Sequence, residues 1–268
     1  DLRNRDSDGD GLAEWFITEY VDCRSGESGM DNCSRFDPAK PLNSVDFNVF
    51  LACECETLAR IADRRGDPVA ASHWRARHAR LNALMNERLW DADTGLYLDA
   101  FAGTTRHTGI PSCVAFYPLM CGAPDAARVE RLLANLEAPD MFGTAVPVPT
   151  VPPSAGEGVY TKDMSRGPMW VNMNWLIAWG LDRYGLADKA QTLRRKTVEE
   201  IERWYERSGV FFEFYDDAGV AAPYELPRKG RMGTVVRDYG WTATLYVDMV
   251  MHLTGASLAR ADQSVPAA

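Results

Sequence analysis

Residues 168–181 read PMWVNMNWLIAWGL, and this stretch decides the fold because it contains no charged side chain. Residues 111–121 (PSCVAFYPLMC) are also uncharged, and residues 240–254 (GWTATLYVDMVMHLT) carry one carboxylate. A helix that is apolar around its whole circumference is buried on all sides. The three segments therefore predict helices at the centre of the molecule.

Between these segments lie helices of a second kind, each with one apolar face. Residues 69–90 place apolar side chains on one face and arginines off it, and residues 125–137 and 188–205 repeat the pattern. This alternation predicts two concentric layers, an inner ring of helices covered by an outer ring. We therefore predict an all-α protein with an (α/α) toroid fold, since every helix of a plain four-helix bundle would be amphipathic.

The connections between the helices are long and polar. Residues 139–167 contain several prolines and glycines with little helical period, and a loop of this length in a compact domain is usually functional. Residues 90–97 and 215–220 predict tight turns with glycine where a positive φ is needed. In a toroid such loops gather at one end of the inner ring, where we expect the substrate cleft.

Composition excludes several classes of function. The 268 residues carry a formal net charge of -9, which disfavours nucleic acid as a partner because phosphate binding needs clustered Lys and Arg. No apolar run is long enough to span a bilayer, so we expect no membrane partner. Cys23 and Cys33 flank a Gly-rich loop and offer a disulfide, but we favour free thiols for all six cysteines and hence a cytoplasmic location.

An acidic motif, DSDGDGLAE, lies near the N-terminus at residues 6–14. Asp6, Asp8, Asp10 and Glu14, with a glycine for the turn, offer oxygen ligands that suit a structural Ca²⁺ ion. The full twelve-residue EF-hand pattern is not met. The alternative is a solvated acidic turn that caps a following helix, and the sequence leaves the two interpretations open.

Five further segments occur in an order that resembles a known family. Together they resemble the glycoside hydrolases related to trehalases and processing α-glucosidases (families 37 and 63). The matching segments are ESGMDNCSRF (27–36), VDFN (45–48), RGPMWVNMN (166–174), FFEFYD (211–216) and YGWTAT (239–244). Any one of them would be weak evidence, but five in order over nearly the whole chain make chance resemblance improbable.

The resemblance implies an inverting α-glycosidase with an (α/α)6, six-hairpin toroid and no required cofactor. It places the general acid on Asp31 and the general base on Glu213. Glycoside hydrolysis needs such a pair, one carboxylic acid for the leaving oxygen and one carboxylate to activate water. The same match and the polarity of the segments assign substrate contacts to Arg35, Arg166, Trp170, Asn172, Asn174 and Trp241.

The match has one departure, because no counterpart of the family's upstream Trp-Asp motif is present before the acid loop. We count roughly eight helices from the periodicity, whereas the family's barrel needs twelve. We therefore expect an incomplete toroid over residues 1–260, corresponding to the C-terminal two-thirds of the family domain, and a disordered tail over 261–268. Partners would be the missing N-terminal segment or a second copy of the chain.

The expected substrate is a small α-glycoside or an oligosaccharide. Met30 stands where trehalases have tryptophan before the acid, so the resemblance is closer to enzymes acting on small α-glucosides or α-mannosides, including glycosylglycerates. The alternative functions are a non-catalytic carbohydrate-binding or scaffold module and an inactive fragment. A polysaccharide lyase or terpene-type cyclase fits less well, because the aspartates at 6–10 lie in a turn.

Overall fold

A computed structural model describes residues 5–230 and 233–256, and the expected tail at 261–268 lies outside these residues. Within them the chain forms seven α-helices. They are α1 (Val45–Arg64), α2 (Pro68–Arg88), α3 (Pro118–Cys121), α4 (Ala126–Glu137), α5 (Val171–Arg183), α6 (Ala187–Ser208) and α7 (Gly240–Thr254).

The strands are short and antiparallel, and they tie loops together. A three-stranded sheet has the order β1 (Glu14–Trp15), β2 (Leu42–Asn43), β5 (Ala100–Phe101), with Glu14 opposite Asn43 and Leu42 opposite Phe101. Two hairpins are formed by β3 (Trp90–Asp91) with β4 (Leu96–Tyr97) and by β6 (Pro227–Arg228) with β7 (Gly233–Thr234). The turn expected at 90–97 is confirmed, with Gly95 at a φ of +73°.

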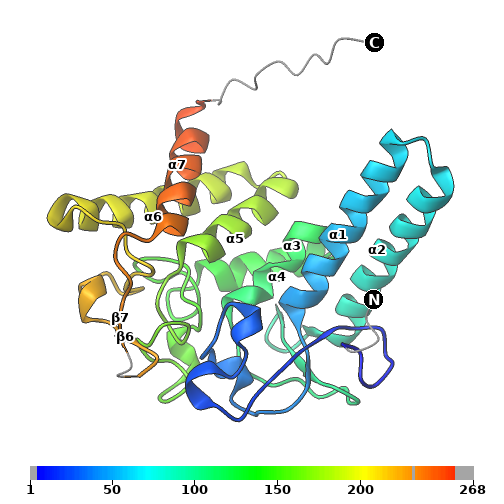
Figure 1. Cartoon of the computed structure of the whole chain (residues 1–268), viewed down its shortest axis with the longest axis horizontal. Helices are drawn as coiled ribbons and strands as arrows, with labels where there is room; N and C mark the ends of the chain where they lie inside the picture. Colours follow the sequence, from blue (N-terminus) through cyan, green and yellow to red (C-terminus); the bar gives the residue numbers. More distant parts are fainter. Residues whose placement is uncertain (1–4, 231–232, 257–268) are drawn as a thin grey trace.

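The helices form two layers, as the alternation of apolar and amphipathic segments predicts. α1, α3, α5 and α7 follow one another as an inner row, in which α1 contacts α3, α3 contacts α5, and α5 contacts α7. α2 packs on α1, while α6 packs on both α5 and α7. Figure 1 shows this row running from the α1–α2 hairpin on the right to α6 and α7 on the left, with the N-terminal loops and β6–β7 below.

The outer helices begin where the sequence supplies caps. The carboxylate of Asp67 accepts a hydrogen bond from the backbone N–H of Ala70 (3.0 Å), and Pro68 occupies the first position of α2. Asp125 caps α4 in the same way through the N–H of Arg128, at 2.9 Å. Such caps satisfy backbone donors that have no partner inside the helix.

Two of the predicted central helices differ from expectation. The segment at 111–121 is not one helix but a 3₁₀ turn (Cys113–Phe116) followed by the single turn of α3. Pro118 lacks the N–H that would continue the first turn, and Gly122, at a φ of +74°, ends the second. The segment is nevertheless buried, as predicted.

α7 is the second difference, because it is not buried on all sides. Of its residues only Thr242 and Met249 are buried, while Trp241 and Val247 are 53% and 54% exposed. α5 and α6 cover one side of α7. The apolar side chains on its other side have no neighbouring helix among the described residues.

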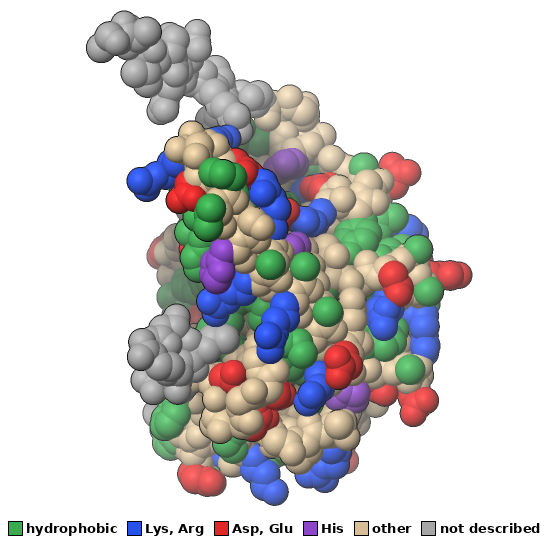
Figure 2. Space-filling view, turned by 90° about the vertical axis from the view of Figure 1, so that its right-hand side faces the viewer, with side chains coloured by type: hydrophobic (Ala, Val, Ile, Leu, Met, Phe, Trp, Pro, Cys, Tyr) green, Lys and Arg blue, Asp and Glu red, His purple; other side chains and the backbone are tan. Residues whose placement is uncertain are grey.

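The surface is mixed in charge. Figure 2 views the side at the right of Figure 1, where cationic and anionic side chains are interspersed with apolar ones. Among residues 5–230 and 233–256, no helix has the length and hydropathy needed to cross a membrane.

Close packing of the inner row depends on Gly180, in the middle of α5. A Cβ atom at this position would lie 2.8 Å from Leu119 Cβ and 3.2 Å from the backbone nitrogen of Met120 in α3. We expect Gly180→Ala to lower the free energy of unfolding by about 1–2 kcal/mol, because overpacking at so close an approach costs about 2–3 kcal/mol against a helix-propensity gain of about 1 kcal/mol. Urea unfolding followed by circular dichroism measures this difference.

Gly240→Ala is the matched control, since a Cβ at Gly240 in the first turn of α7 would meet no atom within 4 Å. We expect it to leave stability within about 0.5 kcal/mol. Equal effects of the two substitutions would contradict the close approach of α3 and α5.

Candidate active site

Asp31 lies in a loop that two short 3₁₀ turns, Gly26–Ser28 and Ser34–Phe36, hold in place. Gly29 ends the first turn at a φ of +75°, a conformation that glycine adopts without steric cost. The Asp31 side chain remains 19% exposed, and its Oδ2 lies 2.6 Å from Lys229 Nζ. The acid-loop carboxylate is therefore reachable from solvent but paired with a cation.

Arg35 anchors this loop to the interior of the protein. Its guanidinium is 1% exposed and forms ion pairs with two buried carboxylates, Asp46 at the start of α1 and Asp99 before β5. Nη1 donates to Asp46 Oδ1 at 3.2 Å and to Asp99 Oδ2 at 2.9 Å, while Asp99 Oδ1 accepts the N–H of Val45 at 2.8 Å. In this structure Arg35 is thus a buried link between loop, helix and strand, which corrects the predicted contact with sugar.

Glu213 is buried, with 3% of its surface exposed. Its carboxylate accepts two hydrogen bonds from Arg228, at 2.6 Å to Oε2 and 3.1 Å to Oε1, and its N–H donates to the carbonyl of Val236 at 3.0 Å. Two backbone hydrogen bonds between Tyr215 and Met169 (2.8 and 2.9 Å) join this segment to the RGPMW segment. The two motifs that resemble the family's base and RGP segments are therefore neighbours.

One hairpin brings the two carboxylates together. Arg228 ends β6 and binds Glu213, and the next residue, Lys229, binds Asp31. Tyr239, the residue before α7, lies close enough to both carboxylates to interact electrostatically, and burial raises the pKa of its phenol. Sequence reasoning missed Arg228 and Lys229, although the basic run PRKGR at 227–231 stands out in an acidic chain.

Arg166 lies beside the acid loop but is paired. Its guanidinium donates to both carboxylate oxygens of Asp37, at 2.9 and 2.6 Å, and to the carbonyl of Asn32 at 3.2 Å. Of the donors of Arg166, only the backbone N–H bonds to Asp163, whose carbonyl accepts it at 2.9 Å. Burial lowers the pKa of Arg166, but the hydrogen bonds to Asp37 and its negative charge raise it by more. The net pKa is raised, so the guanidinium stays charged.

Two predicted substrate contacts are corrected by the structure. Trp170 is buried, donates its indole N–H to the carbonyl of Met164 at 3.0 Å and stacks on Phe214, with ring centroids 5.2 Å apart. Asn174 is buried and bonds to the backbone at Pro147 and Val148. Both side chains shape the wall behind the site because their polar atoms are already satisfied by the protein.

The other two predicted contacts are differently placed. Asn172 is 9% exposed, and its side chain has no hydrogen bond to any described residue. Trp241 is mostly exposed on α7. Their roles in substrate binding stay predictions.

A buried cluster that the sequence did not reveal fixes the loop before Arg166. Lys162 Nζ lies 2.7 Å from Asp216 Oδ1 and 2.5 Å from Asp217 Oδ1, and both carboxylates are buried. The hydroxyl of Tyr160 donates to Asp217 Oδ2 at 2.9 Å. Burial raises the pKa of Asp217, while hydrogen bonds from Lys162 and two backbone N–H groups outweigh burial and lower that of Asp216. The cluster joins the 139–167 loop to the segment that carries Glu213.

A cavity of about 650 Å³, lined by several charged side chains, opens next to the acid loop. Asn32 and Gly230, the residues that follow Asp31 and Lys229, line it. The charged residues that line the cavity are Asp22, Arg24, Asp37, Asp163 and Arg166. Carboxylates, guanidinium groups and an amide on one wall are the groups that hydrogen-bond the hydroxyls of a sugar or polyol.

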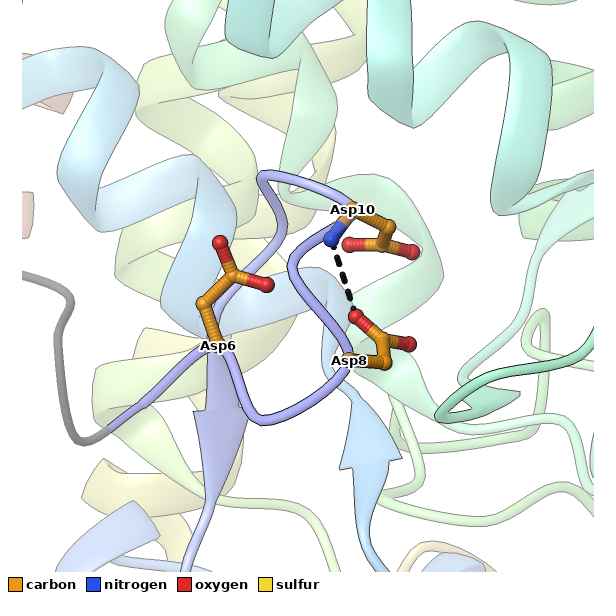
Figure 3. A group of neighbouring side chains, drawn as sticks. All are labelled: Asp6, Asp8 and Asp10. Atoms are coloured by element: carbon orange, nitrogen blue, oxygen red, sulfur yellow. Dashed lines mark hydrogen bonds between the residues drawn. The ribbon is translucent and has the colours of Figure 1, made fainter.

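The predicted calcium ligands are only partly brought together. Carboxylate oxygens of Asp6, Asp8 and Asp10 lie within 4.8 Å of one another, and Figure 3 shows the three side chains on one turn. Glu14 is not in this group: it is buried in β1, and its carboxylate accepts hydrogen bonds from Ser7 at 2.8 and 2.9 Å. The motif leads into strand β1 and not into a helix, so the helix-capping part of the alternative interpretation is wrong.

The acidic turn itself is well ordered by hydrogen bonds. Asp8 Oδ1 accepts the N–H of Asp10 at 3.0 Å, and Asp10 Oδ2 accepts from Asn43 at 2.8 Å. Burial and the charge of Asp8 raise the pKa of Asp10. Two buried oxygens here, Asp6 Oδ1 and Asn43 Oδ1, have no hydrogen-bond partner. All six cysteines are free thiols, as favoured from the sequence.

Comparison with known sequences gives a family match. A model described as the mannosylglycerate hydrolase MGH1-like glycoside hydrolase domain matches residues 2–242. The mannosylglycerate hydrolase of Rubrobacter radiotolerans is 33% identical over 213 residues, covering 78% of this chain and 44% of that protein. A periplasmic trehalase of Salmonella paratyphi B is 27% identical over 207 residues, covering 74% of this chain and 35% of that protein. The chain spans less than half the length of these relatives.

Solved structures agree with the helix arrangement. The GH63 mannosylglycerate hydrolase from Thermus thermophilus in complex with Tris is 27% identical, with a TM-score of 0.59 over 77% of this chain and 45% of that one. Neutral trehalase Nth1 from Saccharomyces cerevisiae, at 18% identity and a TM-score of 0.65, covers 86% of this chain and 41% of that one and shows the fold alone. The predicted all-α (α/α)6 toroid, incomplete in this chain, is confirmed.

The buried pairing of Arg35 predicts a large effect on stability. We expect Arg35→Met to lower the free energy of unfolding by about 3–5 kcal/mol, because two carboxylates would stay buried without their cation. Arg75→Met, which removes an exposed arginine paired with Asp63, is the control and should cost less than about 1 kcal/mol. Urea unfolding of both variants measures these free energies. A loss of stability in Arg35→Met as small as that in Arg75→Met would contradict the anchoring role of Arg35.

Proposed function

We propose, from the premise that this chain belongs to the MGH1-like glycoside hydrolase family, that it hydrolyses small α-glycosides with inversion at the anomeric carbon. Asp31 would act as general acid and Glu213 as general base. The observation that carries the proposal is the convergence of both carboxylates on consecutive residues of one hairpin, Arg228 and Lys229.

The two environments suit the two roles. Asp31 is part-exposed beside the cavity next to the acid loop, where it can reach the glycosidic oxygen of a leaving group. Glu213 is buried. Its backbone is hydrogen-bonded to Val236 and its side chain to Arg228, so the orientation of its carboxylate is fixed. A fixed carboxylate orients an attacking water, and a reachable acid protonates the departing oxygen. The reaction needs no cofactor.

For the substrate we propose an α-glucoside or α-mannoside with a small aglycone, including glycosylglycerates. The cavity next to the acid loop supports this, because its volume of about 650 Å³ lies within the range of small-molecule sites and charged and amide side chains line it. Of the predicted contacts, we keep Asn172 and Trp241 as candidates, and we keep Arg166 as a residue that shapes the cavity wall.

A second candidate is a non-catalytic carbohydrate-binding module or an inactive fragment. It is favoured by one observation, the ion pairs that occupy both carboxylates. The exposed apolar face of α7, with Trp241 and Val247, supports association with further helices or with a second copy. Free thiols support a cytoplasmic location, which we retain as a proposal.

We also propose a structural Ca²⁺ at Asp6, Asp8 and Asp10, without Glu14. Two observations support it: the carboxylate oxygens of the three residues lie within 4.8 Å of one another, and the amide of fully buried Asn43 borders them with an unpartnered oxygen. Oxygen ligands at this spacing suit a hard cation. Bound there, the ion would brace the turn that leads into the three-stranded sheet.

The catalytic proposal predicts that Asp31→Asn and Glu213→Gln each reduce hydrolysis by roughly 10²–10⁴-fold, because each removes a proton-transfer group. Asp140→Asn and Glu206→Gln, exposed carboxylates away from the site, should leave the rate unchanged. A panel of small α-glucosides and α-mannosides, followed by time-resolved NMR of the full-length protein's product, measures rate and stereochemistry together. A first product of α configuration, or full activity in both site variants, would overturn the assignment.

The calcium proposal predicts that saturating Ca²⁺ raises the thermal midpoint of the EDTA-treated protein by roughly 5 °C, since binding at 100 times Kd adds about 2.7 kcal/mol. Asp6→Asn should abolish most of the rise, because Asp6 Oδ1 is an unpartnered oxygen in the turn. Asp140→Asn should keep it. If wild type shows no rise, or Asp6→Asn retains it, the acidic turn is a solvated loop.

A further inference from the structure

A small cavity between α6 and α7 is lined mostly by aromatic side chains. Its volume is about 210 Å³, and its lining residues are Ile201, Glu202, Tyr205, Phe211 and Tyr246. None of them lines the cavity next to the acid loop. The two helices pack against each other at the left of Figure 1. The volume is below the roughly 300–1,000 Å³ of drug-sized ligand sites, so the cavity suits a small ligand.

Phe211 connects the three aromatic rings. Its ring centroid lies 4.8 Å from that of Tyr205 in α6 and 5.5 Å from that of Tyr246 in α7. The backbone carbonyl of Phe211 accepts the N–H of Tyr239 at 3.0 Å, so the position of Phe211 is fixed. Ile201 is buried, whereas Tyr205 is 45% exposed. The cavity therefore has an apolar inner end and an aromatic side that solvent can reach.

Glu202 places a negative charge at the edge of the rings. It is exposed, and its Oε1 accepts the hydroxyl of Tyr246 at 2.8 Å. Burial and the hydrogen bond to Glu202 raise the pKa of Tyr246, so its phenol stays a neutral donor. Among the described residues Glu202 forms no ion pair. The cavity thus holds a carboxylate whose charge is not balanced by a cation of the protein.

The basic side chains on α6 do not occupy this cavity. Arg203 and Arg207 are the basic residues nearest to Tyr205 in the sequence. Their guanidinium groups both lie over the ring of Trp204, 5.1 and 5.0 Å from its centroid. Within residues 5–230 and 233–256, no Lys or Arg lies over the three rings that line the cavity. The ring faces turned toward the cavity, which are negative, are therefore available to a cation from solution.

We propose that this cavity binds a small molecule that carries a trimethylammonium group. Aromatic rings grouped around a quaternary ammonium ion attract it through their quadrupoles. A trimethylammonium group has no N–H, so its methyl groups can pack on the rings while Glu202 balances its charge. A primary ammonium group would have three donors to satisfy, and most of this lining is apolar or aromatic. The proposal does not depend on the proposed glycosidase activity.

Titration of the protein with choline, followed by calorimetry or NMR, tests the proposal. The matched probe is the uncharged isostere of choline, in which a carbon atom replaces the nitrogen. We expect saturable binding of choline and roughly fivefold or greater weakening for the isostere. Because the two probes have the same shape, the ratio of their affinities isolates the effect of the charge. Equal affinities, or no saturable binding of choline, would overturn the proposal.

Substitutions locate the choline site. Tyr205→Leu removes a ring but keeps an apolar side chain, and Glu202→Gln removes the charge. We expect each to weaken choline binding roughly fivefold or more. Tyr224→Leu changes an exposed tyrosine outside the cavity, and Glu130→Gln an exposed glutamate on α4, so neither should alter binding. Choline binding that survives both cavity substitutions would overturn the proposal. Circular dichroism confirms that the variants fold.

Two further comparisons identify the source of the trimethylammonium group and separate the cavity from the proposed active site. We expect the protein not to sediment with phosphatidylcholine vesicles. Sedimentation that Tyr205→Leu abolishes would assign the cavity to a lipid headgroup and overturn the small-molecule proposal. Asp31→Asn should bind choline as wild type does, because the acid loop does not line this cavity. Choline binding in a protein without glycosidase activity would therefore support this proposal and leave the failure of the other distinct.

Discussion

The ion pairs of Arg35 with Asp46 and Asp99 are the constraint on which the rest of the site depends. Three charged side chains are taken out of water, and each needs the other two, because an isolated buried charge costs several kcal/mol. The three residues come from the acid loop, the start of α1 and the segment before β5. Once they meet, the acid loop can occupy one position over the inner helices. The part-exposed carboxylate of Asp31 is therefore held on a rigid base.

The second half of the site is fixed by backbone pairing. Met169 and Tyr215 exchange two hydrogen bonds, and Glu213 bonds through its own N–H to Val236. The Lys162 cluster joins the same segment to the long loop at 139–167. Asp31 and Glu213, the proposed acid and base, thus stand on separately anchored loops, and the β6–β7 hairpin bridges them. Such rigid support is what a proton-transfer site needs, since small displacements of reacting groups cost large factors in rate.

Much of the fold could be predicted from the sequence, because the spacing of apolar residues along a helix indicates which of its faces are buried. The uncharged segments 111–121 and 168–181 do lie in the inner row, and the amphipathic helix α6 covers the second of them. The prediction of continuous, fully buried helices failed at two places, where the hydrophobic period of the sequence did not determine the structure. Pro118 divides one segment into two short turns, and α7 is apolar all round while one of its sides has no neighbour among the described residues.

For the candidate site, the sequence supplied the two carboxylates but not the residues that pair with them. The carboxylates stand in recognisable segments, whereas their partners are set by tertiary contacts that leave no local pattern. Arg35, Trp170 and Asn174 looked like substrate contacts because polar or aromatic residues near a motif are ambiguous between binding and anchoring. Glu14 matched a ligand spacing along the chain, but a strand turned its side chain toward Ser7. Lys229 had no motif at all.

The backbone at Lys229 has an evolutionary consequence. Its φ is +52°, a left-handed conformation that costs a non-glycine residue about 1–2 kcal/mol. Consecutive side chains of a regular strand point to opposite faces, so this kink is what lets Arg228 and Lys229 serve the same site. Selection for stability alone would favour glycine at this position. Replacement by glycine during evolution would therefore relieve the strain but would remove the cation that pairs with Asp31.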